Sequence, residues 1–327
     1  IGSRKKEMNP GAIYLVSSIV VLALATTWGV ALVISPLIRV LKRHPATNLS
    51  SGFWFLLALL PLIAGGVMGL FSTGASLMKS MGWIVDHCGA HPGHPHLCWT
   101  HLGQSLIPGK AFWGILATGV TLFGYSFHRS VWPVWKFNRS LKAFRGPNSF
   151  SIVRSKTPFA FVSGILEPRI YLTDAAVNLL TPQESAIVLN HEREHIRRMD
   201  TIRALVIDIC TRLFPGFGTV REKWAAATEV ECDRASLRAG ASPEEVAMTI
   251  LKLSRASGFL VRTGALTYSD SSEAHLRLRI RSLLHGQPNG RSWILLSIAV
   301  SAVIAILAME FSGVHHALET LLGALRG

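Results

Sequence analysis

Charged side chains are scarce in this sequence, and their scarcity argues against an ordinary soluble protein. Only 16% of the 327 residues are Asp, Glu, Lys or Arg, whereas 49% are hydrophobic. Soluble globular domains usually carry about 25% charged residues. The composition therefore predicts a membrane protein before any single segment is considered.

Cysteine is rare as well, and the absence of any CxxC pair argues against a zinc site built from thiolates. Cys88 and Cys98 lie in a polar loop, where they can form a disulfide if the loop faces an oxidising compartment. Five histidines at 87–101 offer metal or pH sensing as an alternative role for this loop. Cys210 and Cys232 lie in segments predicted to be helical, and we expect them to be buried free thiols.

Four apolar stretches are long enough to cross a bilayer as helices, which takes about 20 residues. They are residues 11–38, 53–78, 111–127 and 293–312. Tryptophans lie near the ends of three of these stretches, where interfacial aromatic residues are expected: Trp54, Trp113 and Trp293. The sequence therefore predicts four transmembrane helices.

Lys and Arg are absent from the loop 80–109, and this absence sets the predicted orientation. Basic residues follow the first span at Arg39, Lys42 and Arg43, and most of the others lie between 129 and 291. The positive-inside rule places these basic segments in the cytoplasm and the loop 80–109 outside. We therefore expect an integral protein of a bacterial inner (plasma) membrane. Its expected parts are three spans in 1–128, a cytoplasmic domain at 129–291, and a fourth span with an outer tail in 292–327.

The net charge of +14 is then mainly a signal of topology. A membrane regulator that binds DNA is the alternative, but the sequence contains no motif that reads nucleic acid. We therefore expect no nucleic-acid partner. The expected partners are the lipid bilayer and a protein substrate.

The cytoplasmic domain is predicted to be mainly helical with a small β-hairpin, an α+β arrangement. Residues 129–148 form a basic, aromatic helix that leads to a turn, and the runs 159–162 and 169–172 form the hairpin. Thr181, followed by Pro182 and Glu184, begins a helix with a capping box, and apolar positions continue along this helix to Val206.

Two further helices complete the predicted domain. One runs over 219–239 and stops at Gly240, a residue type favoured just beyond helix ends. The next begins after Ser242 by the same capping logic as the helix at Thr181.

The segment HEREH, residues 191–195, is the strongest chemical signal in the sequence. His191 and His195 are four residues apart, so both imidazoles project from one helix face and can bind a single zinc ion. Glu192 is placed to accept a proton from the attacking water. The alternative is a charged surface helix with two solvated histidines. The density of charge around the segment argues against a site at membrane depth.

A catalytic zinc site needs a third protein ligand, and the helix at 219–239 offers one. Glu229 and Asp233 are four residues apart on one face, so Glu229 can complete the site while Asp233 bonds a zinc-bound histidine. An ordinary acidic face is the alternative interpretation. Tyr171 and Arg234 are both candidates for stabilising an oxyanion.

Three segments together resemble the BlaR/MecR-type membrane metallopeptidases. They are SKTPFAFVSGILEPRIYL at 155–172, LNHEREHIRRMD at 189–200 and EVECDRA at 229–235. The resemblance implies a gluzincin-like fold, one catalytic zinc ion and a hairpin edge that holds substrate as an added strand. It also implies roles for individual residues: ligands His191, His195 and Glu229, base Glu192, and supporting acid Asp233.

The β-lactam sensors of this family carry a penicillin-binding domain after the fourth span, whereas here only residues 313–327 follow. We therefore do not expect β-lactam sensing, and a signal would enter through the loop 80–109, the tail or a partner protein. The expected function is regulatory proteolysis of a cytoplasmic or membrane-proximal protein, with self-cleavage as an option. Alternatives are an HtpX/Ste24-type quality-control or processing protease, and a signal transducer with vestigial proteolysis.

Overall fold

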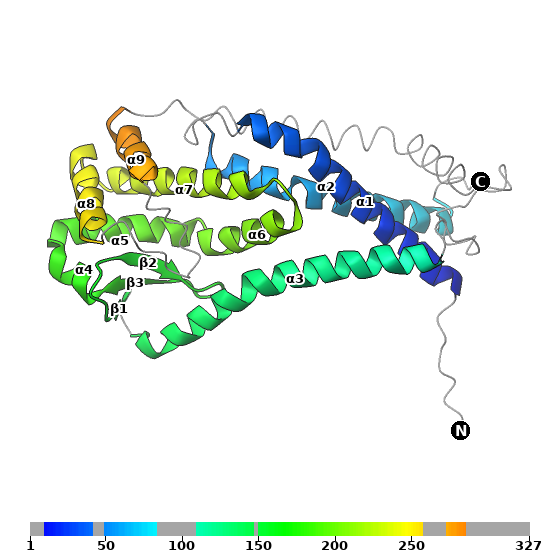
Figure 1. Ribbon diagram of the computed structural model, residues 1–327, viewed down its shortest axis with the longest axis horizontal. Coiled ribbons are helices and arrows are strands. Elements are labelled where there is room, and N and C mark those ends of the chain that lie inside the picture. Colours follow the sequence, from blue (N-terminus) through cyan, green and yellow to red (C-terminus); the bar gives the residue numbers. More distant parts are fainter. Residues whose placement is uncertain (1–9, 42–48, 84–108, 147–149, 258–272, 286–327) are drawn as a thin grey trace, which may run out of the picture. The chain divides into compact units, whose positions relative to one another are not determined.

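The computed structural model describes residues 10–41, 49–83, 109–146, 150–257 and 273–285, and these residues are mainly helical (Figure 1). The elements in chain order are α1 (Pro10–Leu41), α2 (Ser51–Ser80), α3 (Gly109–Leu141), the 3-10 turn η3 (Lys142–Phe144), β1 (Phe150–Val153), β2 (Ala160–Ser163), β3 (Arg169–Thr173), α4 (Asp174–Leu179), α5 (Pro182–Arg197), α6 (Asp200–Leu213), α7 (Gly218–Arg238), α8 (Pro243–Ala256) and α9 (Glu273–His285). The predicted class, mainly helical with a small sheet, is confirmed at this level.

Two of the predicted membrane spans coincide with helices that are long and apolar enough to cross a bilayer. These are Leu15–Leu41 within α1 and Ser51–Met78 within α2. The predicted span 111–127 lies inside α3, which does not meet the same criterion of length and hydropathy. The predicted span 293–312, Cys88, Cys98 and the histidine-rich loop lie outside the described residues.

The chain divides into two compact units. The first contains the described parts of 1–34, 59–124 and 294–327, and the second contains those of 35–58 and 125–293. Within the first unit, α1 and α2 approach closely at Gly65. A Cβ at this position would lie 1.9 Å from the Thr27 hydroxyl oxygen, so only glycine fits between the two helices.

The second unit contains a three-stranded sheet with strand order β1-β3-β2. The predicted hairpin is confirmed: β2 pairs with β3 in antiparallel register, with Phe161 opposite Tyr171. Strand β1, which pairs with β3 in parallel register, was not predicted. This order leaves β2 at one edge of the sheet, on the side that the candidate site uses.

Helix α5 lies between the sheet and α7 (Figure 1). Leu189 and Ile196 pack on the core formed by Val162, Ile170 and Leu172 of the sheet. On the opposite side, the Ser236 hydroxyl of α7 donates a hydrogen bond of 3.0 Å to the Ile187 carbonyl. Burial on both faces fixes α5, the helix that carries the HEREH segment.

The capping predictions for this unit are confirmed. Thr181 and Glu184 form the capping box of α5, and Ser242 and Glu245 form that of α8. Helix α7 ends at Arg238, followed by Gly240 with a φ of +100°. Cys210 and Cys232 are buried free thiols, as expected.

One predicted boundary is wrong. The helix predicted to run from Thr181 through Val206 is divided into α5 and α6 in the structure. The break is at Met199, which adopts a left-handed φ of +55° with its side chain 58% exposed. Apolar periodicity persists across the break, so it gave no sign of the turn. Because the chain turns here, Asp200 begins a new helix and can reach back towards α5.

Trp54 also departs from expectation. Its position near the end of a predicted span indicated a lipid interface, but its side chain is fully buried in the second unit. It meets the Phe53 ring edge to face, with ring centroids 5.5 Å apart. Packing within the protein therefore accounts for this residue.

We predict that Asp208→Asn destabilises the second unit by about 1–3 kcal/mol at pH 7, because charged partners lose a buried carboxylate. Asp208 accepts hydrogen bonds from Ser130 at 2.7 Å and Arg212 at 2.9 Å, and its other oxygen lies 2.9 Å from Arg221. Burial acts to raise the pKa of Asp208, but these partners outweigh it and lower the pKa below its usual value of 3.8.

The lowered pKa means that the stabilisation by Asp208 is present above pH 3.8 and is lost as the pH falls through the lower folded-state value. Thermal unfolding of the full chain in detergent, followed from neutral to acid pH, checks this. Glu222→Gln, at an exposed position of α7, is the matched control. Equal midpoints for the Asp208→Asn variant and the wild type at pH 7 would contradict the prediction.

Candidate metal centre

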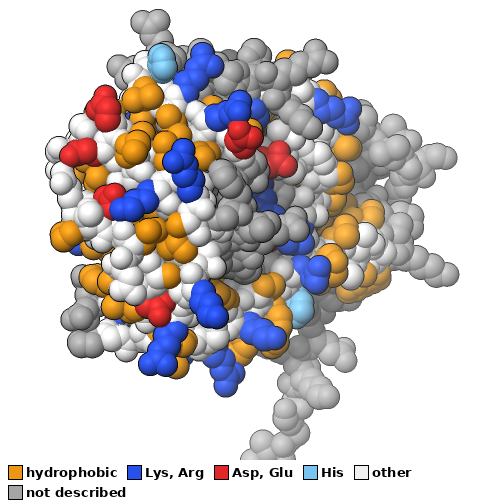
Figure 2. Space-filling view, turned by 60° about the vertical axis from the view of Figure 1, so that its left-hand side comes forward, with side chains coloured by type: hydrophobic (Ala, Val, Ile, Leu, Met, Phe, Trp, Pro, Cys, Tyr) orange, Lys and Arg blue, Asp and Glu red, His pale blue; other side chains and the backbone are white. Residues whose placement is uncertain are grey.

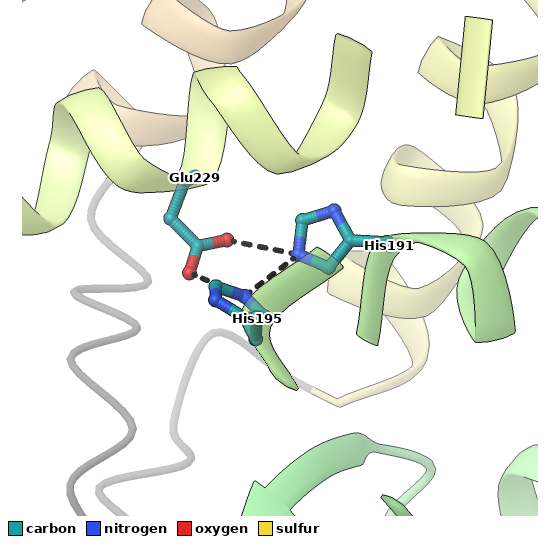
Figure 3. A group of neighbouring side chains, drawn as sticks. All are labelled: His191, His195 and Glu229. Carbon is teal, nitrogen blue, oxygen red and sulfur yellow. Dashed lines mark hydrogen bonds and ion pairs between the residues drawn. The ribbon is translucent and has the colours of Figure 1, made fainter. Parts of the chain in front are cut away.

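The two histidines of the HEREH segment lie one turn apart on α5 and turn their rings towards a common point (Figure 3). The Nε2 atoms of His191 and His195 are 3.2 Å apart. The side chains are 12% and 16% exposed, so both rings are largely shielded from solvent. This is the arrangement that the four-residue spacing predicts.

Glu229 enters the same point from α7, opposite the histidines (Figure 3). Its Oε2 lies 3.5 Å from Nε2 of His191, and its Oε1 lies 3.7 Å from Nε2 of His195. The three side chains thus offer two nitrogen atoms and a carboxylate to one position between them.

The spacing of these atoms fits a tetrahedral metal ion. Zinc binds nitrogen and oxygen at about 2.0–2.2 Å, so tetrahedral ligand atoms lie roughly 3.3 Å apart. The three observed separations range from 3.2 to 3.7 Å. Two histidines and one acid also leave a fourth tetrahedral position free of these ligands, as catalytic zinc sites do.

Each imidazole is held from behind by a carboxylate. His191 Nδ1 lies 2.9 Å from Asp233 Oδ1, and His195 Nδ1 lies 2.9 Å from Asp200 Oδ2. When Nδ1–H donates to a carboxylate, the neutral ring presents the lone pair of Nε2 to the centre. Both carboxylates therefore favour, in the neutral rings, the tautomer that a metal ion requires. The contact of Asp233 with a histidine of the centre was predicted, whereas that of Asp200 was not.

Arg279 of α9 binds both acidic side chains of α7. Its Nε and Nη2 donate to the two oxygens of Asp233 at 2.8 and 2.6 Å, and its Nη1 lies 2.9 Å from Glu229 Oε2. The Asp233 side chain is only 1% exposed and that of Arg279 is 20% exposed. Arg279 was not predicted as part of the site, because the segment HLRLRIR at 275–281 resembles a solvated basic helix face.

The electrostatics of the centre favour a bound cation. Burial acts to lower the pKa of His191, but Asp233 and Glu229 outweigh it and raise this pKa to about 10. Burial acts to raise the pKa of Glu229, but Arg279 and His191 outweigh it and lower the pKa. The two carboxylates therefore favour the protonated form of His191 in the absence of a metal ion, and metal binding would displace that proton.

Glu192 is buried beside this centre, with 7% of its surface exposed. Burial raises the pKa of its carboxyl, and the nearby His195 and His191 oppose that rise. A carboxylate in such surroundings is a stronger base than one in water, so it is suited to accepting a proton.

A cavity of about 250 Å³ opens onto the centre. Its wall contains His191, Glu192, His195 and Glu229. The remaining wall is mostly apolar, from the strand region at 158–162 and from α7 and α8, and includes Phe159, Val162, Trp224, Ile250 and Leu253. Neither oxyanion candidate lines the cavity: Tyr171 stacks on Phe161, and Arg234 lies 3.5 Å from the Ser282 hydroxyl.

Residues 149–283 match the family model described as BlaR1 peptidase M56, and this segment contains every residue of the centre named above. No curated protein matches the chain. The match begins before β1 and ends within α9, so it covers the sheet, the HEREH helix, α7 and Arg279. The match of residues 149–283 to the BlaR1-type M56 peptidases agrees with the resemblance found in the sequence.

Proposed function

We propose that this protein is an integral membrane zinc endopeptidase that hydrolyses peptide bonds of a protein substrate at the cytoplasmic side of the membrane. The observation that carries the proposal is the convergence of His191, His195 and Glu229 on one position, with buried Glu192 beside them. The peptidase family of residues 149–283 supports the same reaction class.

Zinc is the proposed ion because two imidazoles and one carboxylate form a donor set that suits it. When bound, zinc would act as a Lewis acid that polarises the scissile carbonyl and increases the acidity of water. His191, His195 and Glu229 would hold it. Asp233 and Asp200 orient the two imidazoles, as the distances of 2.9 Å allow.

Glu192 is the proposed general base. Its carboxylate accepts a proton from the attacking water and then delivers that proton to the leaving amine. The apolar wall of the cavity keeps bulk water away from this transfer and raises the basicity of the carboxylate. Glu192 thus carries out the proton transfer, and the sheet orients the substrate.

The edge strand β2 is the proposed seat of the substrate. Its residues Ala160–Val162 line the cavity, and β3 occupies only one of its two edges. An extended peptide can add to the other edge through backbone hydrogen bonds, independently of its sequence. Apolar side chains of the substrate would then contact Phe159 and the apolar residues of α8. Because cleavage would depend on an extended segment, flexible regions of a protein are the expected targets, including segments of this chain itself.

The membrane placement rests on α1 and α2 and on the exposure of large apolar side chains along α1–α3, among them Leu32, Val33, Leu70, Trp113 and Val120. Figure 2 shows basic side chains spread over the visible described surface, with acidic ones less frequent. A basic domain beside a membrane is expected on the cytoplasmic side. Regulation by a sensor or partner protein would then act from the membrane region.

This orientation predicts the labelling of a new cysteine on the domain. Glu244→Cys, at an exposed position of α8, should resist a membrane-impermeant maleimide in intact cells and react after permeabilisation. The wild-type chain gives the background from its native cysteines. Equal labelling of the Glu244→Cys variant before and after permeabilisation would contradict the cytoplasmic placement.

The peptidase proposal itself is tested by comparing protein termini in native cells that express the wild type or Glu192→Ala. The wild type should generate new amino termini that the variant lacks, at comparable levels of the two chains. Identical sets of termini would argue for a signal transducer in which the metal centre is structural.

A further inference from the structure

The first turn of α2 is bound by a carboxylate from α7. The Ser51 N–H donates to Glu231 Oε1 at 2.9 Å, and the Ser51 hydroxyl donates to Glu231 Oε2 at 2.8 Å. Ser51 is 1% exposed, and it belongs to the second unit together with α7. A carboxylate at this place satisfies an N–H group that the helix leaves unpaired and complements the helix dipole. Glu231 thus fixes the start of α2 against α7.

Arg198 extends this contact towards the metal centre. It follows the last residue of α5, and its Nη2 lies 2.6 Å from Glu231 Oε2 and also donates to the Ser51 hydroxyl. Its Nε lies 3.3 Å from Asp200 Oδ2. The guanidinium is therefore bound on two sides, by Glu231 with Ser51 and by Asp200, and its side chain is only 14% exposed.

The series of contacts ends on His195. The Asp200 oxygen that meets Arg198 is the same oxygen that lies 2.9 Å from His195 Nδ1. Asp200 is 5% exposed, so water has little access to replace Arg198 or His195 as its hydrogen-bond partner. Cys232, the neighbour of Glu231 on α7, places its Sγ 3.4 Å from the same His195 nitrogen. Four contacts thus join the start of α2 to a proposed metal ligand without an exposed link.

The two histidines are held in a parallel way but by different parts of the fold. Asp233 binds His191 and is itself bound by Arg279 of α9. Asp200 binds His195 and is itself bound by Arg198, which contacts α2. Planar guanidinium groups fix the carboxylates because they offer several donors in a rigid geometry. In the described part of the chain, the His195 side of the centre is therefore the side that these contacts connect to α2.

We propose that Ser51, Glu231 and Arg198 are positioning residues that couple the first turn of α2 to the metal ligand His195. The position of α2 then sets the orientation of the His195 imidazole and the metal affinity of the centre. Helix α2 continues past Ala58 into the first unit, so a change there has a covalent path to Ser51. This inference rests on the proposed function in taking His195 as a metal ligand, and it adds a means of regulation.

Coupling between two sites is reciprocal, because each site changes the free energy of the other by the same amount. Metal binding should therefore slow hydrogen exchange of the backbone amides at 51–54. The experiment compares exchange in the full chain in detergent with and without Zn²⁺, for the wild type and for Glu231→Gln. Zinc should protect these amides in the wild type and should fail to protect them in the variant.

Two control variants separate coupling from a general loss of structure. Ser50→Ala removes the hydroxyl that accepts a 3.3 Å hydrogen bond from Phe53 N–H at the same helix start, but it leaves Glu231 in place. Glu194→Gln removes another buried carboxylate of α5, which pairs with Arg197 and Arg238 instead. Both controls should retain the zinc-dependent protection. The proposal would be overturned if zinc failed to protect these amides in the wild type, or if zinc still protected them in Glu231→Gln.

Metal affinity gives a second readout that does not depend on peptidase activity. Competition of Co²⁺ against a chelator should show about tenfold weaker binding for Glu231→Gln and Ser51→Ala, since outer partners of metal ligands commonly contribute this much. The spectrum of bound Co²⁺ should shift in both variants. If Glu231→Gln fails to fold, the Co²⁺ affinity of Ser51→Ala alone tests the coupling, because this variant keeps every charged group.

The proposed coupling would be overturned if Glu231→Gln and Ser51→Ala bound Co²⁺ with affinities within twofold of those of the Ser50→Ala and Glu194→Gln controls. Failure of the proposed function is distinguishable from this outcome. A chain that binds Co²⁺ with the predicted dependence on Glu231, but cleaves no peptide, would refute the peptidase and leave the coupling intact.

Discussion

Glu192→Gln is expected to lower kcat by about 10²–10⁴-fold, the usual contribution of a general acid–base group. Gln has nearly the same shape as Glu but cannot accept a proton at its amide nitrogen, so the change removes the proposed proton transfer alone. Glu192 is absent from the three-residue ligand cluster of the centre, and metal content should stay unchanged. Single-turnover rates on a peptide library, measured with the full chain in detergent, give the test.

The matched control is Glu194→Gln, two residues along the same helix. Glu194 is also buried, but its side chain pairs with Arg197 and Arg238 rather than facing the centre. It should keep kcat within a few-fold of the wild type. A Glu192→Gln chain that cleaves at the wild-type rate would remove Glu192 from the mechanism.

Arg279→Ala is expected to destabilise the metal-free chain by about 3–5 kcal/mol, because it leaves buried charges without their partner. Asp233 and Glu229 both lose the guanidinium that lies within 3 Å of their oxygens. Zinc would restore part of the lost stability by supplying positive charge at the same place. The increase in the unfolding midpoint on adding zinc should therefore be larger in the variant than in the wild type.

Arg277→Ala is the control for this prediction. Arg277 lies on the same helix with its side chain 76% exposed, and it pairs with Glu273 at the surface. Its loss should change the midpoint little, since exposed ion pairs contribute about 0–1 kcal/mol. Equal midpoints for the metal-free Arg279→Ala and Arg277→Ala chains would show that Arg279 does not stabilise the acidic pair.

The parts of the fold that sequence predicted are those governed by local rules. Capping boxes at Thr181 and Ser242 depend on residues three positions apart, and so does the stop at Gly240. The β2–β3 hairpin is similarly local. These features could be found because each is complete within a few residues.

Features that depend on contacts between residues far apart in the sequence were not predicted, because no short segment contains all the residues involved. Strand β1 is parallel to β3, about twenty residues away, and its four residues carry no alternation of their own. The turn at Met199 was missed for a different reason: Asp200 pairs with His195 and Arg198, five and two residues before it, and such polar contacts do not alter a pattern of apolar residues. The break between α5 and α6 therefore leaves no mark in the apolar periodicity of this segment.

The residues of the candidate centre likewise include some that local spacing predicted and others that it did not. The spacing of His191 and His195 on one helix, and of Glu229 and Asp233 on another, predicted their juxtaposition because each pair shares a helix face. Arg279 comes from a helix forty-six residues after Asp233, and Ser51 lies 180 residues before its partner Glu231. No local pattern marks either one, although Arg279 binds Asp233 behind His191 and Ser51 begins the series of contacts that ends at His195.

Zinc titration of the cleavage rate tests the central claim most directly. The full chain, stripped of metal by a chelator, is supplied with increasing zinc, and new peptide termini are counted by mass spectrometry on a defined peptide library. The rate should rise in proportion to bound zinc and level off at one ion per chain, with no rise for His195→Ala. A rate that is independent of zinc, or one restored equally in His195→Ala, would contradict a zinc peptidase centred on His191, His195 and Glu229.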